Sequence, residues 1–173
     1  MIKRAVCVWP LLLVALVAGC SMFSKPDPRP CPRVSVLNEA QQVTQYRPGP
    51  GRDLTDVAYV GEIGRLKSQC HYEDNQLTVG TEVTVLAERG PAADDPTVSL
   101  PVFIAVTGAG QDILAKEVFD TTVEFPSGLR QGQAVGEYEQ SLHLKDGETG
   151  ANYEIIVGFQ LTKEQLEMNR PRR

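Results

Sequence analysis

Positive charge, histidine and long apolar runs are all scarce in this sequence of 173 residues. Its 17 Lys and Arg residues are outnumbered by 22 Asp and Glu residues, and the net charge is -5. This acidic balance argues against nucleic-acid binding, because such proteins present a basic face to the phosphates. Only one long apolar run occurs, at the start of the chain, which excludes a membrane protein with several spanning helices. The 42% of hydrophobic residues exclude a disordered chain and suit one globular domain.

Catalytic signatures are missing as well. The chain has two histidines and none of the short motifs of serine hydrolases, phosphate loops, zinc proteases or dinucleotide-binding enzymes. His71 follows Cys70, but neighbouring strand residues point to opposite faces of a sheet, so a thiol–imidazole pair is not expected. His143 alternates with Leu142 and Leu144, which indicates a position in solvent. We therefore expect no catalytic residue and no enzyme activity.

Carboxylates form two small clusters. Asp94 and Asp95 lie in a turn-rich loop and could bind calcium, but no Asp-x-Asp-x-Asp loop accompanies them, so a solvated turn is favoured. Glu137 and Glu139 are two positions apart on a predicted strand, and we expect both to face solvent. The sequence therefore predicts no metal site.

The first 19 residues have the layout of a secretory signal. Residues 1–4 are a short basic start, and residues 5–18 are apolar apart from Pro10 and end in small side chains. The run is shorter than the ~20 apolar residues that a spanning helix needs. A buried helix is the alternative, but Pro10 and the basic start disfavour it.

The end of this run, Val17, Ala18, Gly19 and Cys20, resembles the lipobox of bacterial lipoproteins. The resemblance implies cleavage before Cys20, diacylglycerol on its sulfur and an acyl chain on its amine. This covalent lipid takes the place of any cofactor. The chemistry needs cysteine because a thiolate is a good nucleophile near neutral pH. Several acyl chains would hold the protein on a membrane without spanning it; a secreted protein with an incidental cysteine is the alternative.

Two other features indicate which membrane the expected lipoprotein is attached to and which proteins it resembles. In enterobacterial lipoproteins an Asp after the lipidated cysteine favours the inner membrane, so Ser21 indicates the outer membrane by that family rule. Residues 159–170, residues 89–91 and the segment that begins at Cys31-Pro32 are similar to small proteobacterial envelope lipoproteins of unassigned function. That similarity covers most of the mature chain and implies no activity.

Of the four cysteines, two remain available in the mature chain. Cys7 leaves with the signal and Cys20 carries lipid, which leaves Cys31 and Cys70 in an oxidising compartment. We expect one disulfide between them, worth about 3–4 kcal/mol. Two free thiols are the main alternative. A metal or redox pair is disfavoured because no short Cys-x-x-Cys spacing is present.

Residues 20–32 combine the lipidated cysteine with a proline-rich tether. Prolines at alternate positions favour an extended path, which would lift the domain off the bilayer. They are Pro26, Pro28, Pro30 and Pro32. A proline-rich ligand for a partner's groove is the other interpretation of this composition.

Apolar and polar residues alternate along most of the remaining chain, which is typical of half-buried strands. Residues 77–87 and 153–161 are the clearest cases, and residues 138–144 predict a further strand. Residues 98–107 are apolar on both faces in places, so we expect this strand at the centre of a sheet. Pro101 within it predicts a bulge or an edge, because proline cannot donate to a ladder.

Two predicted strands contain irregularities. Gly61 and Gly64 predict bends or bulges within residues 58–72. Residues 113–125 predict a long strand that is broken near Glu117.

About seven short strands with turns roughly every 8–12 residues predict an all-β fold. We expect an immunoglobulin-like antiparallel β-sandwich over residues 33–173. Residues 38–46 predict a short helix or an irregular segment, and the capping box of Thr162 and Gln165 predicts a short C-terminal helix. Tyr153, at the start of a late strand, resembles the tyrosine corner of immunoglobulin-like domains, which implies a structural role.

These features together predict a lipid-anchored binding module on the periplasmic side of the outer membrane. Its expected partners are the membrane, through the lipid, and another envelope protein; no nucleic acid is expected. Residues 89–97, residues 108–112 or an exposed strand edge are the expected contact surfaces. A carrier of an apolar ligand is the first alternative, and a periplasmic enzyme is the second.

Overall fold

The structure, a computed structural model, describes residues 27–170; the predicted signal, Val17, Ala18, Gly19 and Cys20 lie outside this range. Within it the elements follow in this order: β1 (Arg33–Val36), η1 (Asn38–Ala40), β2 (Gln42–Tyr46), η2 (Leu54–Asp56), β3 (Val57–Glu73), β4 (Gln76–Arg89), β5 (Thr97–Gly108), β6 (Ile113–Glu124), β7 (Gln131–His143), η3 (Gly150–Asn152), β8 (Tyr153–Phe159) and α1 (Lys163–Asn169). None of the helices in this range is long and apolar enough to cross a membrane.

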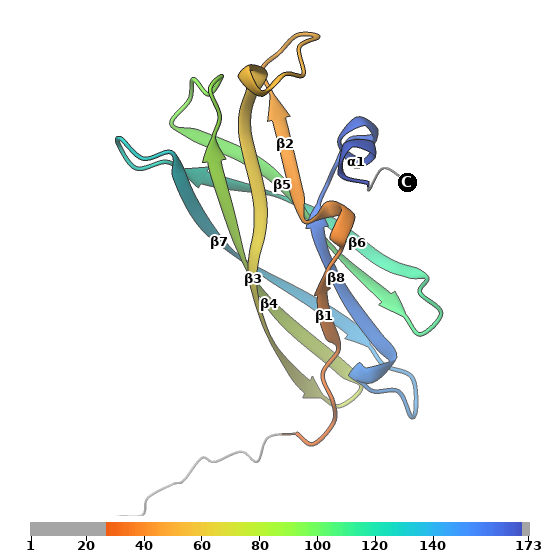
Figure 1. The fold of residues 1–173 in the computed structure, drawn as a ribbon. Helices are drawn as coiled ribbons and strands as arrows, with labels where there is room; N and C mark the ends of the chain where they lie inside the picture. The colour runs from red at the N-terminus through yellow and green to blue at the C-terminus, as the bar shows by residue number, and fades with distance from the viewer. Residues whose placement is uncertain (1–26, 171–173) are drawn as a thin grey trace, which may run out of the picture.

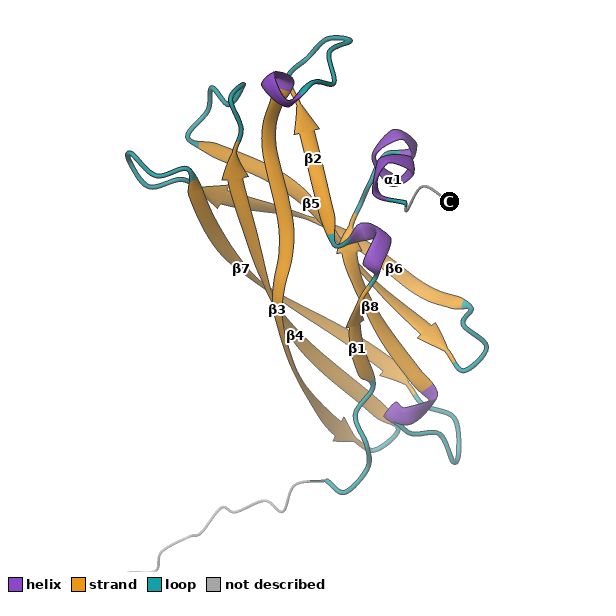
Figure 2. Cartoon of the chain, viewed as in Figure 1, coloured by secondary structure: helices purple, strands orange, loops and turns teal. Residues whose placement is uncertain are grey.

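The strands form two four-stranded sheets that pack face to face (Figures 1 and 2). One has the order β1-β8-β5-β6 and the other the order β2-β3-β4-β7. The pairs are antiparallel except for β1 with β8, which run parallel. Strand β8 pairs with β5 and not with its neighbour in the chain, β7, which is the return connection of Greek-key sandwiches. The predicted immunoglobulin-like β-sandwich with a short C-terminal helix is confirmed.

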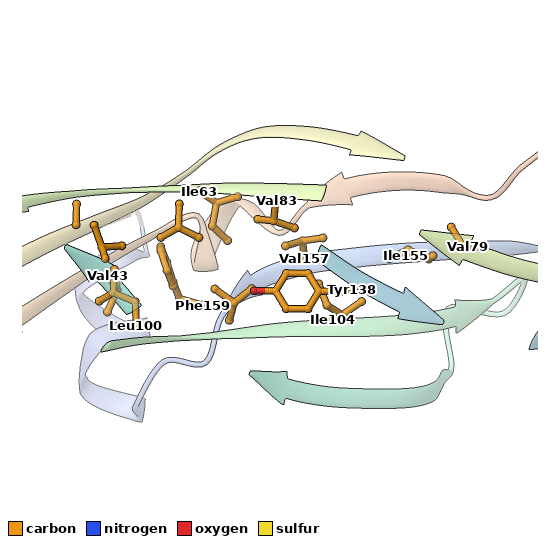
Figure 3. Packing of buried hydrophobic residues seen from close by; sticks show 14 of the residues in the cluster. Val43, Ile63, Val79, Val83, Leu100, Ile104, Tyr138, Ile155, Val157 and Phe159 are labelled. Carbon is orange, nitrogen blue, oxygen red and sulfur yellow. The ribbon is translucent and has the colours of Figure 1, made fainter. Parts of the chain in front are cut away.

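The core lies between the inner faces of the two sheets, as Figure 3 shows. Strand β4 contributes its alternate residues, and its burial pattern follows the period of two that the sequence predicts. Opposite it, β5 and β8 contribute Leu100, Ile104, Ile155 and Val157, each no more than 2% exposed. A Cβ atom at Gly61 would lie 2.7 Å from the Leu100 side chain, so glycine allows the sheets to approach closely here.

Strand β5 lies between β8 and β6, so the predicted central position is confirmed. Pro101 interrupts no hydrogen bond there, because the pairing of β5 with β8 begins one residue later, at Val102. No bulge forms at this proline; the register of β5 with β6 shifts at Val106 and Thr107 instead. The bulge expected in β3 does occur, since the register shifts between Ile63 and Leu66, around Gly64.

Besides the bulge or edge expected at Pro101, two sequence predictions are wrong. Residues 38–46 are a single 3-10 turn followed by strand β2, because buried Val43 and the pairing with β3 hold the second half extended. Strand β6 is continuous from Ile113 to Glu124 with no break at Glu117. Glu117 lies opposite Ile104 on β5 but is exposed, so its charge stays in water and the strand can continue.

Cys31 and Cys70 form a disulfide with a Cα–Cα distance of 5.8 Å, which confirms the predicted pair. Neighbouring residues of the tether also contact the sandwich. The Arg29 guanidinium lies 3.9 Å from the centre of the Tyr72 ring, and its Nη1 donates to the Asp74 carbonyl at 3.3 Å. The last residues of the proline-rich segment are therefore part of the domain surface.

Candidate interaction surface at strand β6

Strand β6 forms one edge of its sheet and pairs only with β5 among residues 27–170. Three large apolar side chains on it face water: Ile113 is 66% exposed, Leu114 57% and Val118 50%. An edge strand offers unpaired backbone N–H and C=O groups, and apolar side chains beside them favour association with another chain. This edge, from Ile113 to Thr121, is the candidate interaction surface.

The other sheet edges are shorter, covered or charged. β1 has only four residues. Helix α1 lies beside β2, where the side-chain amides of Gln165 and Asn169 donate to the carbonyls of Thr44 and Gln42 at 3.1 and 2.7 Å (Figure 1). β7 carries exposed carboxylates at positions 137 and 139. Natural sheets protect their edges in these ways. β6 also carries exposed charges, at Lys116, Glu117 and Asp120, but no helix of residues 27–170 covers it, and Ile113, Leu114 and Val118 remain exposed beside these charges.

An apolar groove of about 250 Å³ lies on the outer face of the same sheet, between β6 and the pair η1 and α1. Its lining includes Leu37, Phe103, Ile156, Leu161 and Leu166. Lys116 on β6 crosses one side of it, with its ammonium 4.4 Å from the centre of the Phe103 ring. The groove therefore joins the β6 edge in a single, largely apolar surface.

A second hollow of about 590 Å³ lies on the outer face of the β2-β3-β4-β7 sheet and is polar. Glu137 and Glu139 line it with Lys67 and Glu82, whose Nζ and Oε1 atoms are 2.7 Å apart. Both glutamates of β7 are exposed, as expected. No group of three or more possible metal ligands occurs within the described part of the chain.

The two loops expected as contact surfaces are not brought together. Residues 89–97 precede β5 and residues 108–112 follow it, so roughly 37 Å of strand separates them. In the first loop the Tyr59 hydroxyl donates to the Asp95 carbonyl and accepts from its N–H, both at 3.1 Å. That loop is fixed against the sandwich, whereas residues 108–112 lead directly into the β6 edge.

Both histidines lie where the alternation places them. His71 is exposed, while its neighbour Cys70 packs against the core in the disulfide. His143 is exposed at the end of β7. The two residue types that could have formed a thiol–imidazole pair therefore occupy opposite faces of β3.

Two tyrosines form three hydrogen bonds at the end of the sandwich where the described chain begins. Tyr153 donates to the carboxylate of Glu148 at 2.6 Å, a bond that raises the pKa of Tyr153 and lowers the pKa of Glu148. A tyrosine corner would use a backbone acceptor, so the resemblance holds for the position of Tyr153 and not for its partner. Tyr72 makes the backbone bonds instead: it donates to the Pro30 carbonyl at 2.6 Å and accepts from the Gly150 N–H at 2.7 Å.

Tyr72 was not predicted from the sequence, although the sequence contains a signal for its role. Tyr72 is two residues after Cys70 on the same strand, so both side chains share one face. A cysteine that bonds to Cys31 on that face brings residues 29–32 to the tyrosine.

Glu154 connects β8 with β1. Its carboxylate accepts hydrogen bonds from Arg33 at 3.1 and 3.2 Å and from the Ser35 hydroxyl at 2.8 Å. The bond with Arg33, followed by the bond with Ser35, lowers the pKa of Glu154. This charge pair helps to hold the short parallel strand in register.

Fold and surface together define an all-β sandwich with one long, uncovered edge strand that exposes three large apolar side chains. A comparison of the chain with models of protein families, with curated proteins and with solved structures finds no match.

Proposed function

We propose that this chain is a lipid-anchored binding module of the cell envelope. Acyl chains on Cys20 would hold it on the periplasmic side of the outer membrane, where it binds another envelope protein through the β6 edge. The observation that carries the proposal is the exposure of Ile113, Leu114 and Val118 beside unpaired strand backbone. No nucleic acid and no cofactor other than the covalent lipid is part of this proposal.

The binding mode that suits this edge is strand addition. An extended segment of the partner would form backbone hydrogen bonds along β6, which give affinity without regard to sequence. Val118 and Lys116 would contact the partner on the outer face, because they are two residues apart on one strand. The fold does not have to change, since β6 is already extended.

The geometry of the anchor is compatible with this mode. The described chain enters at the end of the sandwich near the β3–β4 turn, where Arg29 contacts Tyr72 and Asp74 (Figure 2). The β6 edge runs along the side of the sandwich. A tether attached at that end leaves the side available to a partner in the periplasm.

A carrier of an apolar ligand is the second candidate, and the apolar groove favours it. A volume of about 250 Å³ is slightly below the ~300–1,000 Å³ of common small-molecule sites, and the groove is open to solvent. The edge strand therefore supports protein binding better than the groove supports transport.

Photo-crosslinking in intact cells tests the proposal. A photo-reactive residue at Val118 should give an adduct with a protein of the envelope, identified by mass spectrometry. The matched control is Val135 on β7, which is apolar and 54% exposed, against 50% for Val118. We expect at least several-fold less adduct at Val135. Adducts with lipid alone, or equal protein adducts at both positions, would contradict protein binding through β6.

A further inference from the structure

The outer face of β6 carries a self-complementary charge pattern. Lys116, Val118 and Asp120 lie opposite Ala105, Phe103 and Pro101 of β5, respectively. Phe103 and Ala105 belong to the small outer cluster that also contains Ala40, so these β6 residues share that outer face. Lys116, two residues before Val118, is positively charged, and Asp120, two residues after it, is negatively charged.

We propose that the partner of the β6 edge is a second copy of this chain, paired antiparallel about Val118. This inference rests on the proposed function, because both use the same edge. In this arrangement Val118 lies opposite Val118 of the partner, and each Lys116 lies opposite an Asp120 of the other copy. Two sheets of four strands then form one continuous sheet across a two-fold axis, which is the closed symmetry most common among oligomers.

Among the neighbouring registers, the one about Val118 pairs opposite charges and, within residues 115–121, places no like charges opposite each other. Centring the pair on Lys116 places two ammonium groups opposite each other. Centring it on Asp120 places two carboxylates opposite each other, although each Lys116 then lies opposite Glu124 of the other copy. Like charges directly opposite are destabilising in a sheet, whereas opposite charges stabilise it. A pair centred on Glu117 opposes two glutamates, and a pair centred on Phe119 forms no ion pair.

Both charged residues are available for the new contacts. Neither Lys116 nor Asp120 forms an ion pair within residues 27–170, and both are exposed. Lys116 at present lies over the Phe103 ring, a weak contact that a flexible side chain can exchange for a carboxylate. Two valines meet at the centre and exclude water from the backbone bonds between them.

The interface is small, so the dimer should be weak. Seven residues on each edge, from Ala115 to Thr121, bury less than the ~1,200 Å² of a standard interface. We therefore expect a dissociation constant in the micromolar range or above. Lipid anchors that confine both copies to one membrane plane would raise their effective concentration.

Charge exchange tests the pairing on the full lipidated chain, by sedimentation equilibrium in density-matched detergent. Lys116→Glu and Asp120→Lys should each weaken self-association by roughly tenfold or more, because each turns two attractive pairs into two repulsive ones. An equimolar mixture of the two variants should associate again. In the mixed pair the introduced glutamate faces the introduced lysine, and the unchanged Asp120 of one copy faces the unchanged Lys116 of the other. The double variant, with both charges exchanged, should dimerise like the natural chain.

The outcomes separate this inference from the proposed function. A natural chain that stays monomeric up to millimolar concentration, or single variants that associate as well as it does, would overturn the second copy as partner. The photo-crosslink at Val118 remains a separate measurement. An adduct with a different envelope protein, together with a monomeric chain, would keep the proposed function and reject self-pairing. No protein adduct and no dimer would reject both. Circular dichroism of each variant confirms that the fold is retained.

Discussion

Tyr72 shows how one side chain can join segments that are far apart in the sequence. Its hydroxyl donates to Pro30 and accepts from the N–H of Gly150, and the ring is 7% exposed. Both partners are backbone groups in loops that the ladders do not satisfy. A single hydroxyl thus connects the end of the tether with the β7–β8 connection.

Replacing Tyr72 by Phe should lower the free energy of unfolding by about 1–3 kcal/mol, because it leaves two backbone groups without their partner. Urea unfolding with the disulfide intact measures the change. Tyr153→Phe is the matched control, since its hydroxyl bonds to a side chain at the surface, and it should cost less. Equal losses in the two variants would contradict the importance assigned to the Tyr72 bonds.

Glu154 makes stability depend on pH in a defined direction. Its pKa in the folded protein lies below the usual 4.5, first because of the hydrogen bond from Arg33. The stabilisation is therefore complete above the ordinary pKa of glutamate and is lost as the pH falls through the lowered value. Since Arg33 is 78% exposed, the contribution is only about 0.2–1 kcal/mol.

The variant Glu154→Gln should accordingly be less stable than the natural protein at about pH 7 and equally stable at about pH 2 to 3. Thermal unfolding across this range measures the difference. A constant difference at every pH would show that the loss comes from packing and not from the charge.

At the scale of elements, position in the sheet decides which sequences are tolerated. β5 is apolar on both faces because its outer residues Phe103 and Ala105 pack against Ala40 and Leu161, whereas β4 alternates because only its inner face meets the core. Short β2 is covered by α1, whose capping box is present as predicted: Thr162 accepts from the Gln165 N–H at 3.3 Å, and Gln165 accepts from the Thr162 N–H at 2.9 Å. Long β6 has no such cover over its apolar residues.

The disulfide holds the segment before β1 against β3. The double variant Cys31→Ser/Cys70→Ser should have a free energy of unfolding about 2–4 kcal/mol lower than that of the natural chain. The reason is that the cross-link closes a loop of 39 residues in the unfolded chain. Denaturant titration measures this loss, and the natural chain under reducing conditions should give the same value. A loss below ~1 kcal/mol would mean that other contacts already hold this segment.

At the scale of the whole molecule, the sandwich, the tether and the expected anchor define an orientation. The tether meets the sandwich at one end, where Cys31 is fixed to Cys70, and the β6 edge lies along one side. Two copies paired antiparallel through β6 would therefore carry their tethers at opposite ends of the dimer.

Labelling of cells with palmitate checks the anchor. Cys20→Ala should abolish the label and release the protein from the membrane fraction, because no other cysteine follows the lipobox pattern. Cys31→Ser should keep the label, since it affects only the disulfide. Continued labelling of the Cys20 variant would remove the basis for the proposed location.

Local patterns were sufficient for much of this structure. The alternation in residues 77–87 depends on one strand and its own core face, so it predicts β4 without knowledge of the partner strands. The pairing of Cys31 with Cys70 followed from elimination among four cysteines. The capping box of α1 is likewise a relation between residues three positions apart.

Only the tertiary structure decided which strand became the open edge. The order β1-β8-β5-β6 arises from pairings between residues far apart in the chain, and sequence periodicity does not report them. The prediction failed at Glu117 because a charge on the inner face of a strand indicates a break only where that face is buried, and Glu117 is exposed. Exposure of Val118, and with it the proposed contact surface, is thus a property of the assembled sandwich, whereas the strand that carries it is a property of the local sequence.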